Sequence, residues 1–354
     1  MSRFFSNKFD KLEPYVPGEQ PKDVKYIKLN TNESPFAPSS NVIKAAELEA
    51  SRLQLYSDPD VQDICDAIAG LYGVSPDEVL PSNGSDETLN FAFMAFCDKN
   101  NPICFPDISY GFYPVFAEFN NIPYEEIPLK EDFSIDYRDY CGKEKNIVIA
   151  NPNAPTGMAL PLWQIEEIIK SNPDNIVIID EAYVDFGAQS AVGLIKKYDN
   201  LIVIQTFSKS RSMAGARLGY AVACKDIIND LNTVRFSTNP YNVNRMTIAC
   251  GAAAISDNEY YMNNCKIIAE TREFTKKALE DMNFEVLPSK ANFLFARSRN
   301  IGGKLLYEKL KQNGILIRHF EKERIKDYNR ITIGTKEQME TFLDTVKKIL
   351  EDNV

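Results

Sequence analysis

Residues 175–186 read NIVIIDEAYVDF, an unbroken apolar run that ends abruptly in two carboxylates. Because no polar residue interrupts positions 176–179, the run indicates a strand that is buried on both faces of a parallel sheet. Ligands of such open sheets bind in the crevice outside the carboxyl ends of the strands. The pattern therefore predicts that Asp180 lies at a ligand crevice, although an acid that only caps the following segment would read the same way.

Two further apolar runs lie on either side of this one in the sequence. Residues 147–157 read IVIANPNAPTG, so the first run ends in a loop of Asn, Pro and Gly, which tolerate the dihedral angles of tight loops. Residues 201–220 read LIVIQTFSKSRSMAGARLGY, so the other run is soon followed by Lys209. In this order, three strand ends bring an amide, a carboxylate and an amine to one edge of a sheet. The sequence thus predicts an α/β fold with a large, doubly wound, mostly parallel sheet.

Lys209 lies among small hydroxyl residues, with Arg217 eight positions further on. A lysine attacks an aldehyde at neutral pH only when its pKa is lowered, and burial beside another cation has that effect. Thr206, Ser208 and Arg217 offer two hydroxyls and a planar guanidinium, which suit a dianionic phosphate. The segment therefore predicts a lysine that forms a Schiff base beside a phosphate clamp. A basic surface loop after a strand is the alternative.

The carboxylate and the lysine together suit a pyridoxal ring. A carboxylate such as Asp180 can keep the pyridine nitrogen of that ring protonated, which makes the ring an electron sink, and Tyr183 can reach the ring's phenolic oxygen. A loop asparagine could donate to the same oxygen. A second phosphate cradle is indicated by residues 82–87, SNGSDE, before a helix-like segment, since free amides at a helix N-terminus attract phosphate. An ordinary helix cap predicts the same string.

The composition is that of an ordinary enzyme. A chain of 354 residues exceeds the usual limit of a single core, so we expect two domains. A polar, proline-containing break at 237–244 indicates their boundary. The motif order, with the resemblance named below, implies an N-terminal arm over 1–33 that joins the small domain, a large domain over 34–240 and a small α+β domain over 241–354.

Charge, cysteines and hydropathy exclude several functions. A net charge of −10 argues against nucleic acid as a partner. Seven cysteines without a C-x-x-C pair and a single histidine, His319, oppose a disulfide framework and a metal site. The sequence has no apolar run long enough to cross a bilayer and no signal peptide, so we expect no membrane contact and a cytoplasmic location.

In this order, the motifs resemble those of the fold-type I, pyridoxal-phosphate-dependent aminotransferases of class I/II, most closely the histidinol-phosphate aminotransferases. The likeness runs nearly end to end. Besides the motifs above, it includes PYVPG (14–18), LNTNESP (29–35), LYSDP (55–59), SYGFY (109–113), ANFLF (291–295), GILIR (314–318) and NRITIGT (329–335).

The resemblance implies pyridoxal 5'-phosphate as the cofactor and assigns residues to it. Gly84, Ser85 and Asp86 would form the phosphate loop, and Tyr110 would stack on the pyridine face. Tyr56 would cross a subunit interface to the partner's cofactor phosphate, which implies a homodimer. The other residues expected at the cofactor are Asn153, Asp180, Tyr183, Thr206, Ser208, Lys209 and Arg217. One departure is Ala154, where the family commonly has an asparagine that bonds the ring oxygen. Either Asn153 replaces it or Tyr183 acts alone.

The substrate residues and the reaction follow from the same resemblance. Arg330 would grip the substrate carboxylate, Arg318 would help to bind the distal phosphate or carboxylate, and Tyr15 and Asn32 would close over the substrate. The implied reaction belongs to histidine biosynthesis: L-histidinol phosphate and 2-oxoglutarate give imidazole-acetol phosphate and L-glutamate, with Lys209 as the general base. An aromatic-amino-acid aminotransferase and a threonine-phosphate decarboxylase on the same scaffold are the alternatives.

Overall fold

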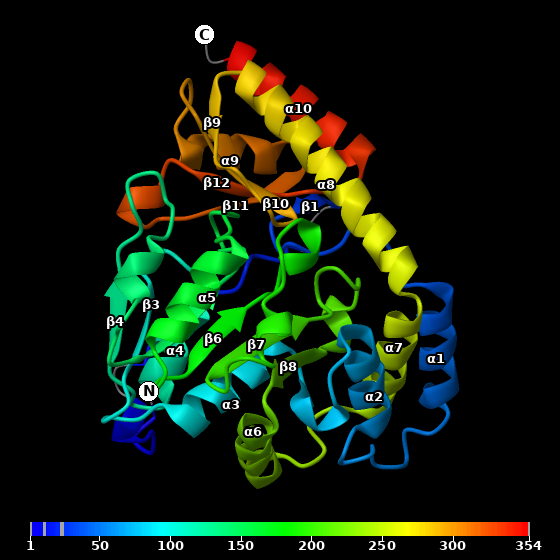
Figure 1. Cartoon of the computed structure of the whole chain (residues 1–354). Coiled ribbons are helices and arrows are strands. Elements are labelled where there is room, and N and C mark those ends of the chain that lie inside the picture. Colours follow the sequence, from blue (N-terminus) through cyan, green and yellow to red (C-terminus); the bar gives the residue numbers. More distant parts are fainter. Residues whose placement is uncertain (1, 10–11, 22–24, 353–354) are drawn as a thin grey trace.

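The computed structural model describes residues 2–9, 12–21 and 25–352, so parts of the predicted N-terminal arm lie outside the described residues. Its larger sheet has seven strands among these residues, in the order β2-β8-β7-β6-β5-β3-β4 (Figure 1). The strands are β2 (Val79–Ser82), β3 (Ile103–Pro106), β4 (Tyr124–Ile127), β5 (Asn146–Ala150), β6 (Val177–Asp180), β7 (Leu201–Thr206) and β8 (Gly219–Ala223). The pairs from β7 to β4 are parallel and β8 is antiparallel to both of its neighbours, which confirms the predicted sheet.

The three apolar runs of the sequence form the adjacent strands β5, β6 and β7. Ala150 and Asp180, the last residues of β5 and β6, are level with Ile204, and β7 continues two residues further to Thr206. Alternate side chains enter two different cores. Ile179 packs in the cluster that holds α2 (Gln62–Tyr72) and α5 (Leu162–Ser171), whereas Ile178 packs in the cluster that holds α3 (Ser85–Phe96) and α4 (Phe112–Phe119). A strand covered on both faces has no solvent side for polar residues, which explains the unbroken runs.

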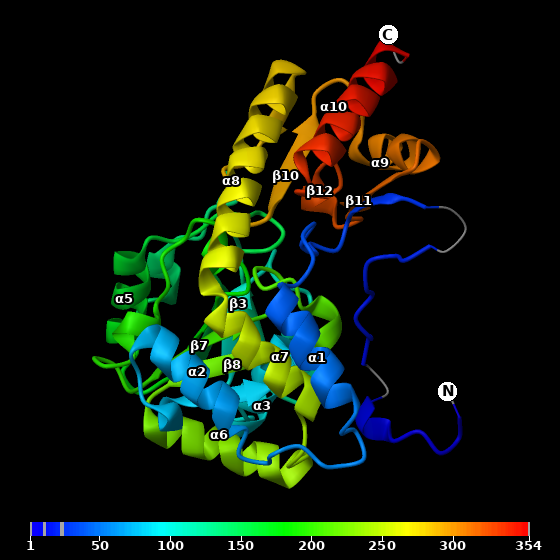
Figure 2. The ribbon, with the colours of Figure 1, turned by 90° about the vertical axis from the view of Figure 1, so that its right-hand side faces the viewer.

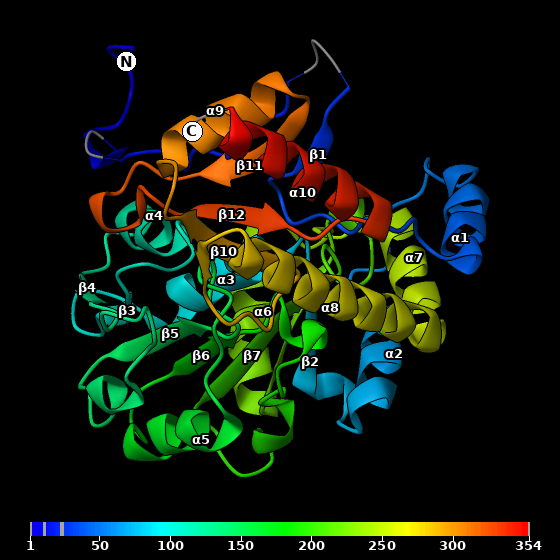
Figure 3. The same cartoon turned by 90° about the horizontal axis from the view of Figure 1, so that it is seen from above.

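Helices cover both faces of the large sheet (Figures 1 and 3). These are α1 (Ser40–Ala50), α2 (Gln62–Tyr72), α3 (Ser85–Phe96), α4 (Phe112–Phe119), α5 (Leu162–Ser171), α6 (Lys225–Thr238) and α7 (Arg245–Ser256). Short 3-10 turns occur at Asn7–Phe9, Pro76–Glu78, Tyr137–Tyr140, Val184–Phe186, Val192–Leu194, Ala214–Ala216 and Glu323–Ile325. Within the described ranges, no helix combines the length and apolar character that crossing a membrane requires.

A second sheet of five strands among the described residues has the order β1-β11-β12-β10-β9. Its strands are β1 (Ile27–Leu29), β9 (Phe284–Val286), β10 (Phe293–Ser298), β11 (Ile315–His319) and β12 (Asn329–Thr332), accompanied by α8 (Asn258–Asp281), α9 (Gly303–Gln312) and α10 (Lys336–Glu351). The N-terminal segment contributes β1, which runs parallel to β11. This pairing favours an arm that belongs to the small domain.

Helix α8 links the two halves of the molecule (Figure 2). Tyr261, near its start, is buried in the core of the large sheet, whereas Cys265, Ile268 and Leu279 are buried in the core of the small sheet. The preceding α7 packs on α1 and α2 of the large half. The boundary at residue 240 stays a prediction, but this packing favours a boundary in the first turn of α8, because the apolar face of α7 is buried on the large half.

Candidate active site

The carboxyl edge of the large sheet encloses a cavity of about 220 Å³. Asp180 is the last residue of β6, and Lys209 lies three residues beyond the end of β7. Because β6 and β7 are adjacent and parallel, both side chains line this cavity. The other predicted cofactor residues that line it are Ser85, Asp86, Tyr110, Tyr183, Thr206, Ser208 and Arg217.

The amine of Lys209 is held in place by one backbone oxygen, since its Nζ donates to the carbonyl of Thr31 at 3.1 Å. The pKa of Lys209 is lowered to about 8, mainly by burial. The positive charges of Arg330 and Arg217 contribute to this decrease, and Arg330 contributes more than Arg217. Sequence reasoning expected a lowered pKa and named Arg217 as the neighbouring cation. A lysine with this pKa has an appreciable neutral fraction near neutral pH, so its nitrogen can attack a carbonyl carbon.

Asp180 is a buried carboxylate that forms no ion pair within the described ranges. Its side chain is 5% exposed; Oδ2 accepts from the hydroxyl of Tyr113 at 2.8 Å, and Oδ1 accepts from the amide of Ala182 at 3.2 Å. Burial raises the pKa of Asp180 to about 6, and these two hydrogen bonds oppose the shift. A buried negative charge is costly without a cation. A pyridinium nitrogen in the adjoining cavity would supply that cation, so Asp180 suits a pyridoxal ring.

The far end of the cavity is a cradle for an anion. Arg217 Nη2 pairs with Asp86 Oδ2 at 3.1 Å, and Thr206 Oγ1 donates to Ser208 Oγ at 3.0 Å. Gly84 has φ of 88°, and a Cβ there would lie 2.6 Å from Arg217 Nη2. A side chain at this position would displace the guanidinium from the start of α3, and the positive φ favours glycine there. Because a phosphate would compete with Asp86 for Arg217, we expect the Asp86 pair to loosen when an anion binds.

Tyr183 is held by the N-terminal segment and the small sheet. Its hydroxyl accepts from Asn32 Nδ2 at 3.0 Å. Asn32 is 1% exposed, and its Oδ1 in turn accepts from Thr332 Oγ1 on β12 at 2.9 Å. Because Asn32 already supplies a donor, the hydroxyl proton of Tyr183 is left for another acceptor in the cavity. Asn32 also lines the larger cavity described below, and its predicted role of closing over the substrate stays a prediction.

The structure does not turn Asn153 toward the cavity. Its Oδ1 accepts from Ser109 Oγ at 2.7 Å, and its Nδ2 donates to the carbonyl of Ile108 at 3.0 Å and to Thr156 Oγ1 at 3.2 Å. Turning this buried amide to a ligand would break these bonds. Ala154, by contrast, lines the cavity. Of the two alternatives for the ring oxygen, these contacts disfavour Asn153 and favour Tyr183 acting alone.

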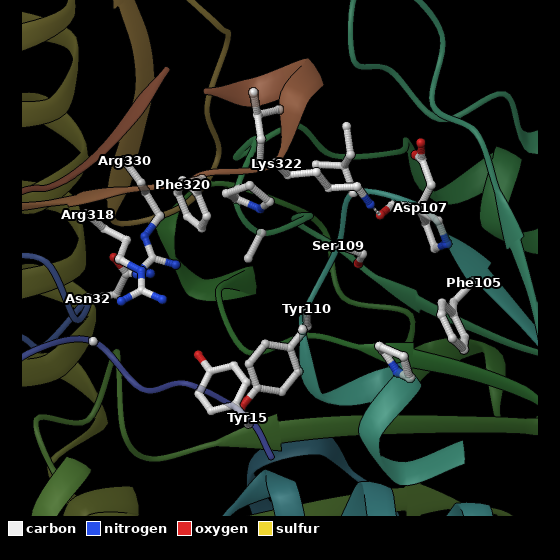
Figure 4. A pocket seen from close by; sticks show the side chains of 18 of the residues that line it. Tyr15, Asn32, Phe105, Asp107, Ser109, Tyr110, Arg318, Phe320, Lys322 and Arg330 are labelled. Carbon is white, nitrogen blue, oxygen red and sulfur yellow. Dashed lines mark hydrogen bonds between the residues drawn. The ribbon is translucent and has the colours of Figure 1, made fainter. Parts of the chain in front are cut away.

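A second cavity of about 420 Å³ opens beside the first and contains the predicted substrate residues (Figure 4). The guanidinium groups of Arg318 and Arg330 lie next to each other, and the rings of Tyr15 and Tyr110 face them from across the cavity. Arg330 Nη2 donates to the carbonyl of Asn30 at 2.8 Å, while its Nε is buried without a partner. Arg318 donates to the carbonyls of Val16 and Pro17, both at 3.2 Å.

These two arginines form no ion pair with a carboxylate among the residues that the structure describes. Burial lowers the pKa of Arg330, with the charge of Arg318 as a further cause in the same direction. Two neighbouring guanidiniums that lack a counter-ion and line a cavity are suited to a carboxylate or a phosphate. The cavity is thus electrostatically prepared for an anionic substrate.

Tyr56, a predicted cofactor residue, lines neither cavity. Its side chain is 80% exposed and its ring stacks on Tyr241 with centroids 4.6 Å apart. This placement agrees with a role in the site of a second copy, which stays a prediction.

Sequence reasoning missed two contacts of the site. Tyr113 belongs to the motif SYGFY, but no role was predicted for it, although it lies one helical turn beyond Tyr110 and that spacing could have suggested a shared face. Thr31 likewise belongs to a motif without a predicted role. Its contact with Lys209 is made by a backbone oxygen, which leaves no signal in the residue type.

Comparison with known proteins agrees with this geometry. Residues 24–346 match the family model described as aminotransferase class I and II. The chain belongs to this family. A histidinol-phosphate aminotransferase of Brachyspira hyodysenteriae is 50% identical over 354 residues, which cover 99% of this chain and 100% of that protein.

Two solved structures share the fold. The histidinol-phosphate aminotransferase of Sinorhizobium meliloti in complex with pyridoxal-5'-phosphate has a TM-score of 0.90 and 22% identity, covering 100% of this chain and 99% of that one. L-threonine-O-3-phosphate decarboxylase of Porphyromonas gingivalis has a TM-score of 0.80 and 22% identity, covering 92% of this chain and 99% of that one. The fold therefore suits both reaction types.

Proposed function

We propose that this protein is a pyridoxal-phosphate-dependent aminotransferase that converts L-histidinol phosphate and 2-oxoglutarate into imidazole-acetol phosphate and L-glutamate. The observation that carries the proposal is the joint placement of the Lys209 amine and the Asp180 carboxylate in one cavity. The full-length likeness to a histidinol-phosphate aminotransferase at 50% identity supports this choice of substrate. The same likeness places the reaction in histidine biosynthesis.

The residues of the smaller cavity divide the work of holding the cofactor. Arg217, Ser208, Thr206 and Ser85 would bind its phosphate, and the hydroxyl of Tyr183 would donate to the ring oxygen. When bound, pyridoxal phosphate supplies an aldehyde carbon and an electron-withdrawing ring. Asp180 would place its negative charge against the ring nitrogen.

Lys209 has two tasks in this scheme. Its nitrogen would form the covalent link to the cofactor, and its neutral amine would serve as the base for the proton on the substrate's α carbon. A pKa of about 8 suits both tasks, because the neutral amine is the nucleophile and the base. The carbonyl of Thr31 accepts a hydrogen bond from Lys209 Nζ and so stabilises the ammonium form of this lysine.

The larger cavity must accept two different anions in turn. Arg318 and Arg330 would bind the phosphate of histidinol phosphate in one half-reaction and a carboxylate of 2-oxoglutarate in the other. A pair of guanidinium groups can bind both anions, because the planar oxygens of a carboxylate and the tetrahedral oxygens of a phosphate each accept paired N–H hydrogen bonds from arginine. Tyr15, whose ring lies 6.2 Å from that of Tyr110, would cover the substrate from the N-terminal segment.

The substrate itself can be tested by steady-state turnover. We expect kcat/KM for histidinol phosphate to exceed that for phenylalanine by at least about 100-fold, since phenylalanine has no phosphate and its single carboxylate satisfies only part of the hydrogen-bonding capacity of two arginines that have no carboxylate partner among the described residues. Equal values would favour the aromatic aminotransferase. Carbon dioxide release from phosphothreonine without added keto acid would favour the decarboxylase.

The active unit is, in this proposal, a homodimer. Several large apolar side chains are exposed near Tyr56, including Leu48 (65%), Leu53 (59%) and Leu55 (52%). A group of such side chains marks a protein interface. An apolar cavity of about 540 Å³ lies nearby, lined by Val42, Ile43 and Met213 among others. The cytoplasm stays the proposed compartment, supported by seven cysteines that are all unpaired.

Mixed dimers test the role of Tyr56. If Tyr56 serves the partner's site, a dimer of one Tyr56→Phe chain and one Lys209→Ala chain has one intact site, whereas a residue acting within its own chain would leave none. We expect Tyr56→Phe alone to weaken cofactor binding about 10-fold, as for a hydrogen bond to a charged group. The two variant chains carry different tags, so that the mixed dimers can be purified. Their turnover at limiting cofactor should be roughly half that of the unmodified dimer. No recovery would contradict the shared site, and Tyr124→Phe on β4 is the matched control.

A further inference from the structure

The turn that opens α4 carries two tyrosines whose hydroxyls bind two of the three carboxylates that line the smaller cavity. Tyr110 donates to Asp86 Oδ1 at 2.7 Å, and Tyr113 donates to Asp180 Oδ2 at 2.8 Å. Tyr110 lines the cavity, so it can touch a ligand. Tyr113 lines neither cavity of the site, and its hydroxyl is bound to Asp180. Its effect on the chemistry must therefore pass through that carboxylate.

The ring of Tyr113 is fixed on all sides. It is fully buried in the core between α3, α4 and the sheet, and Tyr110 packs edge-on against it with centroids 5.6 Å apart. Phe105 on β3 lies on another side at 5.7 Å. The phenol cannot turn away to water, and burial raises its pKa well above the ordinary value. The hydroxyl thus stays protonated and remains a donor to Asp180.

This donor acts against the effect of burial on Asp180. Burial, together with the negative charge of Asp86, favours the protonated acid, and the hydrogen bonds from Tyr113 and from the amide of Ala182 favour the carboxylate. A protonated acid would offer no negative charge to a ring nitrogen in the cavity. With Oδ2 bound to Tyr113, the carboxyl plane is also fixed, which leaves the remaining lone pairs to face the cavity.

We propose that Tyr113 is a positioning residue that holds Asp180 as an oriented carboxylate, so that the ring nitrogen of the bound cofactor stays protonated. The inference rests on the proposed cofactor, but it concerns a residue that never touches it. A phenol that merely fills the core beside α4 is the competing explanation, and the two differ in what happens when only the hydroxyl oxygen is removed.

The test compares Tyr113→Phe with Tyr140→Phe in the holoenzyme. Tyr140 is 1% exposed and its hydroxyl has no hydrogen-bond partner in the described part of the chain, so its removal controls for loss of a buried hydroxyl. The probe is pyridoxal phosphate labelled with nitrogen-15 in the ring, observed by NMR. We expect the protonated signal in the unmodified enzyme and in Tyr140→Phe. In Tyr113→Phe the signal should move toward neutral pyridine and the cofactor Kd should rise roughly 10-fold.

An unchanged ring-nitrogen signal in Tyr113→Phe would overturn the inference even if turnover fell. So would a lower melting temperature of the apoprotein with unchanged cofactor affinity, because that result describes packing alone. If Tyr113→Phe fails to fold, 3-fluorotyrosine at position 113 retains the ring and strengthens the donor, so the ring-nitrogen signal should stay at the protonated position; a shift of that signal toward neutral pyridine would also overturn the inference. If the unmodified protein forms no covalent link to the cofactor, the proposed function fails instead, which separates the two failures.

Discussion

Replacing Lys209 by alanine should abolish turnover and the visible absorbance of the covalently attached cofactor. The substitution removes the nucleophile and the general base at once, and general-base catalysis alone contributes about 10²–10⁴-fold. The fall in kcat should therefore reach at least that range, with the substrate KM less affected because Arg318 and Arg330 remain. Absorbance spectra and single-turnover kinetics of the purified variant measure both effects.

Lys196 offers a matched control for this substitution. Its Nζ donates to the carbonyl of Gly73 at 2.9 Å, so it too is a lysine bound to one backbone oxygen, but it lies away from the cavity. Lys196→Ala should retain the spectrum and the activity. Borohydride reduction of the unmodified enzyme should attach the cofactor to the peptide that contains Lys209. An adduct on another lysine, or normal turnover in Lys209→Ala, would refute the assignment.

The carboxyl edge of the large sheet could be predicted because each of its strands has a recognisable pattern within a short stretch of sequence. Each of β5, β6 and β7 is an apolar run that stops at a polar residue, and strands connected in sequence order tend to be neighbours. Residue patterns alone therefore predicted that Asp180 and Lys209 share one crevice. The boundary between the domains was less accessible, because nothing local marks α7 as part of the large half. Which half α7 belongs to is decided by its packing on α1 and α2, which are distant from it in the sequence.

Contacts between distant segments could not be derived from residue patterns. Asn32 reaches Tyr183 on the large half and Thr332 on the small sheet, so its role depends on the packing of three separate segments. The resemblance placed it near the substrate, but only the structure shows which side chain it binds. Asn153 shows the opposite case. Its residue type suited a ligand contact, yet the loop satisfies its amide internally.

Asp180→Asn should lower the activity of the holoenzyme and raise the free energy of unfolding of the apoprotein. The amide has the same shape but no charge, so it cannot pair with a protonated ring nitrogen. Removal of one preorganised electrostatic contact in an active site typically lowers kcat by about 10²–10³-fold. We expect a loss of that size in the holoenzyme, measured at saturating cofactor. Activity within about twofold of the unmodified enzyme would contradict the role of Asp180.

The apoprotein should respond in the opposite direction. The pKa of Asp180 is raised by burial from 3.8 to about 6, so ionisation of this group costs the folded state free energy that the unfolded chain does not bear. The cost is absent below about pH 4, where both states are protonated, grows between about pH 4 and pH 6, and is complete above that range. At about 1.4 kcal/mol per pKa unit, it amounts to about 3 kcal/mol at neutral pH.

Apo Asp180→Asn should accordingly be more stable than the unmodified apoprotein at pH 7.5, by up to about 3 kcal/mol, and the difference should shrink as the pH falls toward 4. Urea denaturation of both apoproteins at several pH values measures this difference. Saturating cofactor should reverse the order, because the ring nitrogen supplies the missing cation only to the carboxylate. A variant that is less stable than the unmodified apoprotein at pH 7.5 would show that Asp180 is already compensated without a ligand, and the electrostatic argument for a cation in this cavity would then fail.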